Sequence, residues 1–377
     1  MTEHLKFNNP TSRPRILVAP LEWGLGHATR CIPIIQRLLE QQCDVLLAAE
    51  GGTFELLQKE FPTLPFLPLV GYRVKYSRKK QLLPFRLLVQ LPGIILTIYR
   101  EHRWLKKVVN EFRIDGVISD NRFGLYHKNI PCIYITHQLL IKTPYRFLEK
   151  AFQKLNYSFI KKYSECWIPD AQQLGIAGDL SHPLKLPVHS KYIGPLSRFK
   201  ISEDIEKKYD LLISISGPEP QRTIFEDMLL KNLEAFEGSV LFVRGLPGET
   251  SFPVVHNSNI CMMKHLNAEG LNSALLQSSM IISRCGYTTI MDLIKLGKKA
   301  VLVPTPGQTE QEYLAEYMKN RKMFYSVSQE DFILKDVLEK QTSFPFVVLK
   351  YNMDEYKMAV DQWVISLQQA LPLNHED

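Results

Sequence analysis

The sequence of 377 residues lacks the residue patterns that hold metals or disulfides. Its six cysteines are scattered singly, without a Cys-x-x-Cys pair, and no histidines cluster at the spacing of metal ligands. Structural zinc sites and disulfide frameworks depend on such patterns. We therefore expect neither of them, and cysteine usage of this kind is typical of the reducing cytosol.

The chain also lacks a long uninterrupted apolar run. Its first fifteen residues, MTEHLKFNNPTSRPR, are polar and contain no apolar core of a secretory signal. The stretch Leu82–Tyr99 approaches the roughly 20 apolar residues that cross a bilayer. Four residues interrupt it: Pro84, Arg86, Gln90 and Pro92. We therefore expect a cytoplasmic protein without a transmembrane helix.

Positive charge gathers around this stretch, in a chain whose formal net charge is +7. The basic residues are Lys75, Arg78, Lys79, Lys80, Arg86, Arg100, Arg103, Lys106 and Lys107. An apolar surface ringed by cations suits peripheral contact with the inner face of the cytoplasmic membrane. A buried helix with charged flanks is the alternative. No aromatic and basic platform of the single-strand type is present, so no nucleic-acid partner is expected.

The length predicts two domains of about 150–200 residues each. Short apolar runs alternate with helical runs in the first half, as in a parallel sheet covered by helices on both faces. The strands expected there are 15–20, 43–50, 115–120, 131–136 and 165–170, and the helices are 28–40, 53–60, 82–112 and 145–163. A Pro-, Gly- and Ser-rich stretch over 178–204 predicts the interdomain linker.

The same alternation restarts after the linker. Strands are expected at 209–216, 239–245, 259–264, 280–284 and 299–304, and helices at 222–236, 268–278, 288–296, 310–321 and 329–340. An amphipathic run over 353–371 closes the chain. The prediction is an α/β protein with two doubly wound Rossmann-like domains that face a cleft, where ligands bind beyond the carboxyl ends of the strands.

The segment SRCGYTTIMDLIKLG (283–297) has the composition of a diphosphate site. A strand ends at Ser283, Gly286 turns the chain, and a helix opens at Thr288. A helix N-terminus favours a diphosphate through its N–H groups and its dipole. Asp292, one turn into the helix, suits the two hydroxyls of a ribose. Thr289 and Asp292 also have the Thr-x-x-Asp spacing of a helix capping box, and spacing alone favours that alternative.

Two further loops of the second half join a strand to a helix. SISGPEPQR places Ser216, Gly217 and Arg222 at a turn, although its prolines are also ordinary turn and helix-start residues. GQTEQEYLA places Gln311 and Glu312 at a helix start, where acidic residues also simply complement the helix dipole.

The first domain has its own candidate turn, EWGLGHATR (22–30), directly after the first strand. Gly24 and Gly26 permit a sharp turn and a close approach of the backbone. His27 follows them, and it is either a base or an ordinary helix-start residue. Three more candidates follow later strands, where turn or loop chemistry is the alternative: Asp120, Asn121 and His137.

The two C-terminal motifs, SRCGYTTIMDLIKLG and VPTPGQTEQEYLAEYM, resemble the donor-binding half of GT-B glycosyltransferases. The likeness is greatest to the MurG-like group, with a C-terminal half of the glycosyltransferase family 28 type, and the GLGH turn is similar to the N-terminal loop of that group. The resemblance implies a diphosphate pocket lined by Ser283, Arg284, Gly286 and Thr288, with Asp292 on the ribose where the group usually has Glu.

The same resemblance assigns the remaining candidates. Gln311 and Glu312 would reach the donor sugar. The glycine-rich phosphate loop of the group is mostly lost in SISGPEPQR, so only Ser216, Gly217 and Arg222 are carried over there. Gly24 and Gly26 would approach the donor, and His27 would accept the proton of the acceptor hydroxyl. Asp120, Asn121 and His137 would touch the acceptor, or Asp120 would orient His27.

The function expected from this resemblance is inverting, metal-independent transfer of a sugar from a nucleotide-sugar, with UDP favoured, to an acceptor hydroxyl. The acceptor is unassigned, with a lipid-linked or cell-envelope glycan in view, and no cofactor is expected. Residues 1–195 would bind the acceptor, 196–352 the donor, and the helix within 353–377 would pack back on the first domain. A nucleotide-sugar hydrolase or epimerase, and a non-catalytic nucleotide-sugar-binding partner protein, stay open as alternatives.

Overall fold

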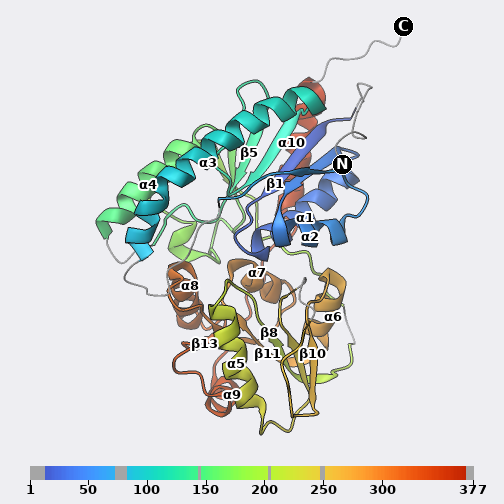
Figure 1. Cartoon of the computed structure of the whole chain (residues 1–377), viewed down its shortest axis with the longest axis vertical. Helices are drawn as coiled ribbons and strands as arrows, with labels where there is room; N and C mark the ends of the chain where they lie inside the picture. The colour runs from blue at the N-terminus through green and yellow to red at the C-terminus, as the bar shows by residue number, and fades with distance from the viewer. Residues whose placement is uncertain (1–12, 73–82, 143–145, 203–204, 247–250, 371–377) are drawn as a thin grey trace. The chain divides into compact units, whose positions relative to one another are not determined.

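The computed structural model describes residues 13–72, 83–142, 146–202, 205–246 and 251–370 (Figure 1). These residues form two compact units. The first contains the chain up to Leu196 together with the segment from Asn352 onward, and the second begins at Ser197 and ends at Tyr351. Each unit is built on one parallel sheet with helices, so the predicted pair of Rossmann-like domains is confirmed.

The first unit contains a seven-stranded parallel sheet in the order β3-β2-β1-β4-β5-β6-β7. Its strands are β1 (Arg15–Pro20), β2 (Asp44–Ala49), β3 (Phe66–Pro68), β4 (Gly116–Asp120), β5 (Cys132–Ile135), β6 (Glu165–Ile168) and β7 (Ser190–Tyr192). The strand order reverses between β1 and β4, and this reversal is where doubly wound sheets bind ligands.

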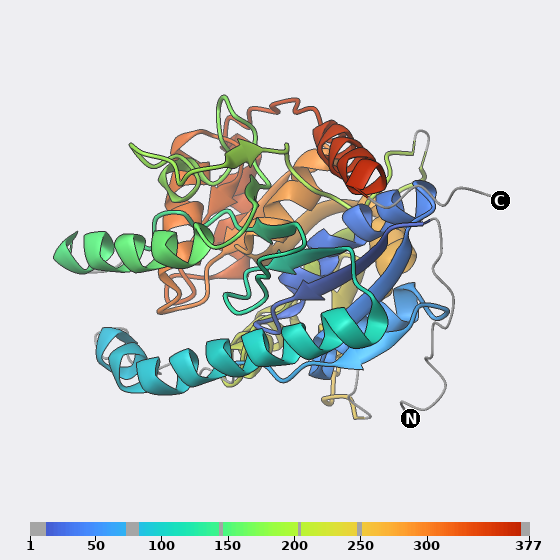
Figure 2. The same ribbon diagram turned by 90° about the horizontal axis from the view of Figure 1, so that it is seen from above.

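Helices cover both faces of this sheet. They are α1 (Leu25–Glu40), α2 (Gly51–Glu60), α3 (Leu83–Phe112), α4 (Arg146–Ile160) and α10 (Glu355–Ala370). A 3-10 turn lies at Gly178–Leu180. Figure 2 shows α3 along one face and α10 on the other. The ring of Trp363 in α10 packs edge-to-face against the ring of Trp167 in β6. The Trp363 ring also lies against Gly116 of β4, where any larger residue would collide with it.

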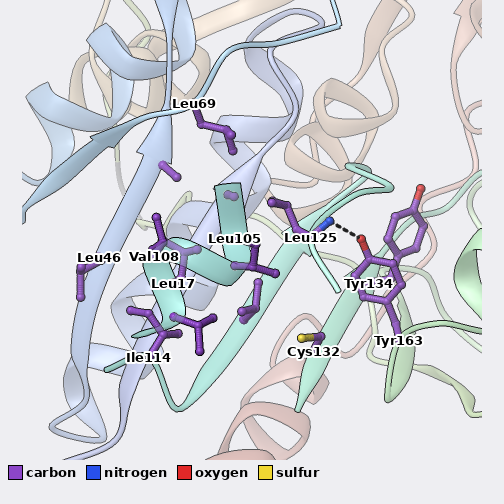
Figure 3. Packing of buried hydrophobic residues seen from close by; sticks show 14 of the residues in the cluster. Leu17, Leu46, Leu69, Leu105, Val108, Ile114, Leu125, Cys132, Tyr134 and Tyr163 are labelled. Carbon is purple, nitrogen blue, oxygen red and sulfur yellow. Dashed lines mark hydrogen bonds between the residues drawn. The ribbon is translucent and has the colours of Figure 1, made fainter. Parts of the chain in front are cut away.

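The core between the sheet and α3 explains the apolar strand runs. Leu105 and Val108 of α3 pack on the same side of the sheet as Leu17 and Leu46, and all four are buried (Figure 3). Tyr163 closes the cluster, and its hydroxyl accepts a hydrogen bond from the Leu125 backbone N–H at 3.1 Å. Strands buried on both faces need continuous rather than alternating apolar residues.

The second unit repeats the arrangement with six parallel strands in the order β10-β9-β8-β11-β12-β13. The strands are β8 (Tyr209–Ser214), β9 (Val240–Val243), β10 (Ile260–Met263), β11 (Ser278–Arg284), β12 (Ala300–Val303) and β13 (Tyr325–Ser326). The helices are α5 (Gln221–Leu233), α6 (Ala268–Gln277), α7 (Tyr287–Lys295), α8 (Thr309–Asn320) and α9 (Leu334–Ser343). Its strand order reverses between β8 and β11.

Three short edge strands were absent from the sequence-based expectation: β3, β7 and β13. Of these, β7 corrects the linker, because residues 178–204 do not only connect the two units. They add the last strand of the first sheet, and the compact units change only between Leu196 and Ser197. Residues 371–377, which follow α10, lie outside the described part of the chain.

Candidate active site

The candidate residues of the first unit meet where the strand order reverses. β1 ends at Pro20 and β4 ends at Asp120, and these two residues are paired in the parallel register. The turn that carries His27 therefore lies beside Asp120, although the two are 93 residues apart in the sequence. Parallel strands place their carboxyl ends at the same edge of the sheet, which is why distant segments converge here.

The β1–α1 turn requires glycine at only one of the two expected positions. Gly24 is the N-cap of α1 and has a φ of 81°, which lies in the left-handed region that residues with side chains rarely adopt. Gly26 lies within the first turn of α1, in ordinary helical conformation. His27 follows Gly26, and 15% of its side chain is exposed. A ligand can therefore reach the ring, although most of it is buried.

Asp120 is the centre of the site. Its side chain is fully buried and accepts hydrogen bonds from Arg30 through both carboxylate oxygens, with the Arg30 Nε to Oδ2 distance at 2.5 Å. His27 Nδ1 lies 2.7 Å from Oδ1, and Cys31 Sγ lies 3.6 Å from Oδ2. Although burial opposes ionisation, Arg30 and His27 hold the pKa of Asp120 well below its usual range.

The ionised state of Asp120 determines the tautomer of His27. His27 Nδ1 lies 2.7 Å from Asp120 Oδ1, which can only accept a hydrogen, and 2.9 Å from Arg30 Nη2, which can only donate one. We assign the hydrogen to Nδ1 because the carboxylate contact is the shorter of the two, which leaves Nε2 as the unprotonated nitrogen. Burial and the charge of Arg30 lower the pKa of His27 below 6.5, and Asp120 offsets part of this effect. The imidazole is therefore neutral near pH 7 and able to take up a proton.

Two other candidates take different places around this centre. His137 is buried, and its Nδ1 lies 2.9 Å from Nη1 of Arg30. Asn121 has a φ of 59° and accepts a hydrogen bond from the Tyr134 hydroxyl at 2.9 Å. The geometry of Asn121 is that of a turn residue anchored to the sheet, which is the alternative that the sequence left open.

Arg30 was not expected from the sequence, yet it joins His27, Asp120 and His137. A second buried ion pair was also missed: Arg122 Nε donates to Glu101 of α3 at 2.8 Å, and both side chains are buried. Glu22 of the β1–α1 turn lies 3.6 Å from Arg122. These charges fix the turn to β4 and α3. Of these three residues, Glu101 has a sequence signal, because it is a charged residue on an otherwise apolar face of α3.

The candidate residues of the second unit lie at the ends of β8, β11 and β12. Gly286 is the N-cap of α7, and no side chain caps this helix. The capping-box alternative is wrong, because α7 begins at Tyr287 and Thr289 lies inside its first turn. Asp292 instead accepts a hydrogen bond from Ser197 Oγ at 2.6 Å. Burial raises the pKa of Asp292 to about 6.

The two residues before this turn face inward. Ser283 is buried, and its hydroxyl donates to the Arg284 carbonyl at 3.3 Å. The Arg284 guanidinium lies 4.0 Å from the Phe225 ring centre and donates to the Gln221 carbonyl at 2.9 Å. Burial lowers the pKa of Arg284 to about 9. Its visible role is to hold the start of α5 against β11.

Three other candidate residues contact residues close to them in the sequence. Arg222 is buried and pairs with Glu226 at 3.1 Å, while the Ser216–Gly217 turn beside it is exposed. Gln311 accepts from the Thr305 N–H at 2.9 Å. Glu312 accepts from the Gly307 N–H at 3.1 Å. Gln311 and Glu312 therefore shape the β12–α8 loop.

Within the described residues, no group of three or more His, Cys, Asp or Glu side chains has the arrangement of a metal site. The helices of the same residues include none that combines the length and apolarity needed to span a membrane.

Comparisons with known proteins agree with this architecture. A family model described as Glycosyl transferase family 1 matches residues 15–342. An uncharacterized glycosyltransferase of Methanosarcina acetivorans is 23% identical over 346 residues, which cover 84% of this chain and 88% of the relative. The model carries a family 1 description, whereas the sequence motifs had suggested the family 28 type.

Solved glycosyltransferases share the fold at low identity. The glycosyltransferase of kitacinnamycin has a TM-score of 0.62 at 12% identity, over 94% of this chain and 96% of that one. MurG of Acinetobacter baumannii has a TM-score of 0.51 at 12% identity, over 96% of both chains. SsfS6 of Streptomyces sp. SF2575, solved with thymidine diphosphate, has a TM-score of 0.57 at 12% identity, over 96% of this chain and 97% of that one.

We expect Asp120→Asn to lower the free energy of unfolding by about 3–5 kcal/mol, because it leaves the buried Arg30 without its counter-ion. Chemical denaturation of both proteins measures the difference. Asp361→Asn is the matched control, because Asp361 binds Arg37 in a partly exposed pair, where the loss is about 1 kcal/mol or less. An equal, small loss in both variants would contradict the central role of Asp120.

Proposed function

The chain belongs to glycosyl transferase family 1 and is a glycosyltransferase of the GT-B type, and from this premise we propose that it transfers a sugar from a nucleotide-sugar to an acceptor hydroxyl with inversion. The first unit would bind the acceptor and the second the donor. The observation that carries the proposal is the His27–Asp120 pair, in which a buried carboxylate holds a neutral imidazole at the end of β4.

His27 is the proposed general base. Its Nε2 would accept the proton of the acceptor hydroxyl while the oxygen forms a bond to the anomeric carbon and the bond from that carbon to the diphosphate breaks. The nucleoside diphosphate leaves with the bonding electrons. Asp120 and Arg30 position the imidazole, and Asp120 stabilises the imidazolium that forms, as an ionised carboxylate does for an adjacent charged histidine. His137 would contact the acceptor.

The donor would bind at the end of β11 and the start of α7. The N-terminus of α7 has no side-chain cap and therefore suits the diphosphate, with Gly286 and Thr288 beside it. Ser197 binds Oδ1 of Asp292, which leaves Oδ2 for a ribose hydroxyl. Gln311 and Glu312 order the loop that we assign to the donor sugar. The resemblance to the MurG-like group favours UDP, and the thymidine diphosphate bound to SsfS6 makes thymidine diphosphate the second nucleotide to test.

We also propose that the first unit rests on an anionic membrane surface. Ile95, Leu96 and Tyr99 of α3 are exposed, with Ile95 58% exposed. Arg100, Arg103, Lys106 and Lys107 are exposed on the next turns. Apolar side chains beside cations are the features of a peripheral contact, and such a contact suits a lipid-linked or cell-envelope acceptor. Lys75, Arg78, Lys79, Lys80 and the side chain of Arg86 lie outside the described residues.

Asp292→Asn tests the donor site. We expect calorimetric titration with UDP, dTDP, GDP and their common sugar conjugates to show one preferred diphosphate, bound about tenfold to a hundredfold more weakly by the variant, because a hydrogen bond from a ribose to a charged group is lost. Asp227→Asn, on the exposed face of α5, is the control. The donor assignment is overturned if no nucleotide binds to wild type at millimolar concentration.

His27→Ala tests the base. We expect the release of nucleoside diphosphate in the presence of acceptor to slow by about 10²–10⁴-fold, with nucleotide affinity unchanged, and His127→Ala to retain full activity. Because burial holds the pKa of His27 below 6.5, kcat/KM of wild type should fall only when the pH drops below that value. Nucleoside diphosphate release that is indifferent to a panel of lipid-linked and glycan acceptors would identify a hydrolase instead.

A double variant of α3, Ile95→Ser with Leu96→Ser, tests the membrane contact. We expect the fraction that sediments with phosphatidylglycerol vesicles to fall about tenfold or more, because each exposed side chain contributes about 1.5–3 kcal/mol when it is buried. Binding of wild type should also weaken as salt is raised. Ile224→Ser on α5 is the control, since Ile224 is exposed in the second unit. Unchanged sedimentation of the double variant would refute the contact.

A further inference from the structure

The β8–α5 turn already contains an anion. Glu219 lies two residues before α5 and its side chain is 53% exposed. One carboxylate oxygen accepts from Arg222 Nε at 2.5 Å, and the other accepts from the Thr223 backbone N–H at 3.3 Å. Thr223 belongs to the first turn of α5, whose N–H groups have no partner within the helix. The carboxylate therefore sits where such a turn would bind a phosphate.

The charged side chains packed behind this turn favour an anion at the position of the Glu219 carboxylate. Arg222 and Arg244 are both buried, and both bind the single buried carboxylate of Glu226. Among the described residues, Glu219 is a second carboxylate bound to Arg222, and it adds a negative charge to this cluster. A buried guanidinium is stabilised by each carboxylate bound to it, so a negative group at this position is favourable.

The opposite side of the turn is open and offers a further donor. Gly217 has a φ of 116°, and a Cβ added there would meet nothing nearer than Thr305 Oγ1 at 3.8 Å. Thr305 is only 1% exposed, and its hydroxyl has no hydrogen-bond partner among the residues that the structure describes. A buried hydroxyl without a hydrogen-bond partner is unfavourable unless something binds it. An oxygen-rich ligand in the turn would satisfy it.

We propose that the Glu219 carboxylate is an internal anion, which occupies a phosphate position of the β8–α5 turn in the nucleotide-free protein and which the diphosphate of the donor must displace. This inference rests on the proposed donor function and names a residue that limits donor affinity. The half-exposed Glu219 can rotate into solvent, whereas the buried Glu226 cannot. A phosphate oxygen would then take over Arg222 Nε and the Thr223 N–H, and Thr305 Oγ1 would lie on the side of the same turn that Gly217 leaves open.

Glu219→Gln tests this inference. Because the variant loses the competing charge but keeps the size of the side chain, we expect it to bind UDP, dTDP or inorganic pyrophosphate at least tenfold more tightly than wild type in calorimetric titrations. Uridine and thymidine, which carry no phosphate, should bind both proteins equally. Glu237→Gln is the matched control, because the exposed Glu237 follows the opposite end of α5 and its loss should leave every affinity unchanged.

The outcomes separate the two proposals. Equal affinity of wild type and Glu219→Gln for a diphosphate that wild type binds would overturn the role of Glu219 and leave the donor site standing. A similar gain in Glu237→Gln would also overturn it, since the effect would then be one of net charge. If no nucleotide or pyrophosphate binds to any of the proteins, the donor function and the inference built on it both fail.

Discussion

The buried carboxylate of Asp120 is the interaction on which the first unit depends. A lone charge in this interior would cost several kcal/mol, so the fold must supply partners for it. It does so from α1, where Arg30 and His27 both bind the same carboxylate. Because Arg30 neutralises Asp120 and both residues bind it, the start of α1 is fixed against the end of β4. The orientation of His27 follows from this packing and needs no separate device.

The parallel sheets explain why such contacts are possible between distant residues. In both units the central strand is followed by strands on one side and then, after a long return, on the other. The first turn of each unit consequently faces the end of a strand that comes much later in the chain. His27 meets Asp120 in this way, and in the second unit the β8–α5 turn lies beside the end of β12, where Gly217 approaches Thr305. The candidate residues lie at the reversal of strand order because two loops there are left uncovered by a crossover helix.

The sequence predicted the central elements well because buried strands are recognisable as continuous apolar runs. It missed β3, β7 and β13, which have three, three and two residues, because so short an edge strand has no periodicity to detect. At the site, it found residues whose type suggests chemistry, such as His27 and Asp292. It did not find Arg30 or Arg122, because charged side chains ordinarily face solvent and only tertiary contacts reveal their burial. The Thr289–Asp292 spacing was ambiguous for a related reason. The same separation of three residues occurs in a capping box and between two residues inside a helix.

The same pairing of arginine and carboxylate has opposite consequences in the two units, and exposure decides which. Asp120 is fully buried, so its bonds to Arg30 persist as long as the unit is folded, and they hold the His27 imidazole in place. Glu219 binds Arg222 with comparable geometry but reaches solvent, where water compensates much of what the carboxylate would lose on leaving. A rigid pair is what a positioned base requires, and an exchangeable pair is what a site for a soluble anion requires. The loss of the glycine-rich loop in SISGPEPQR is therefore compatible with a donor site, because the anion position is kept and is filled by the chain itself until a ligand competes for it.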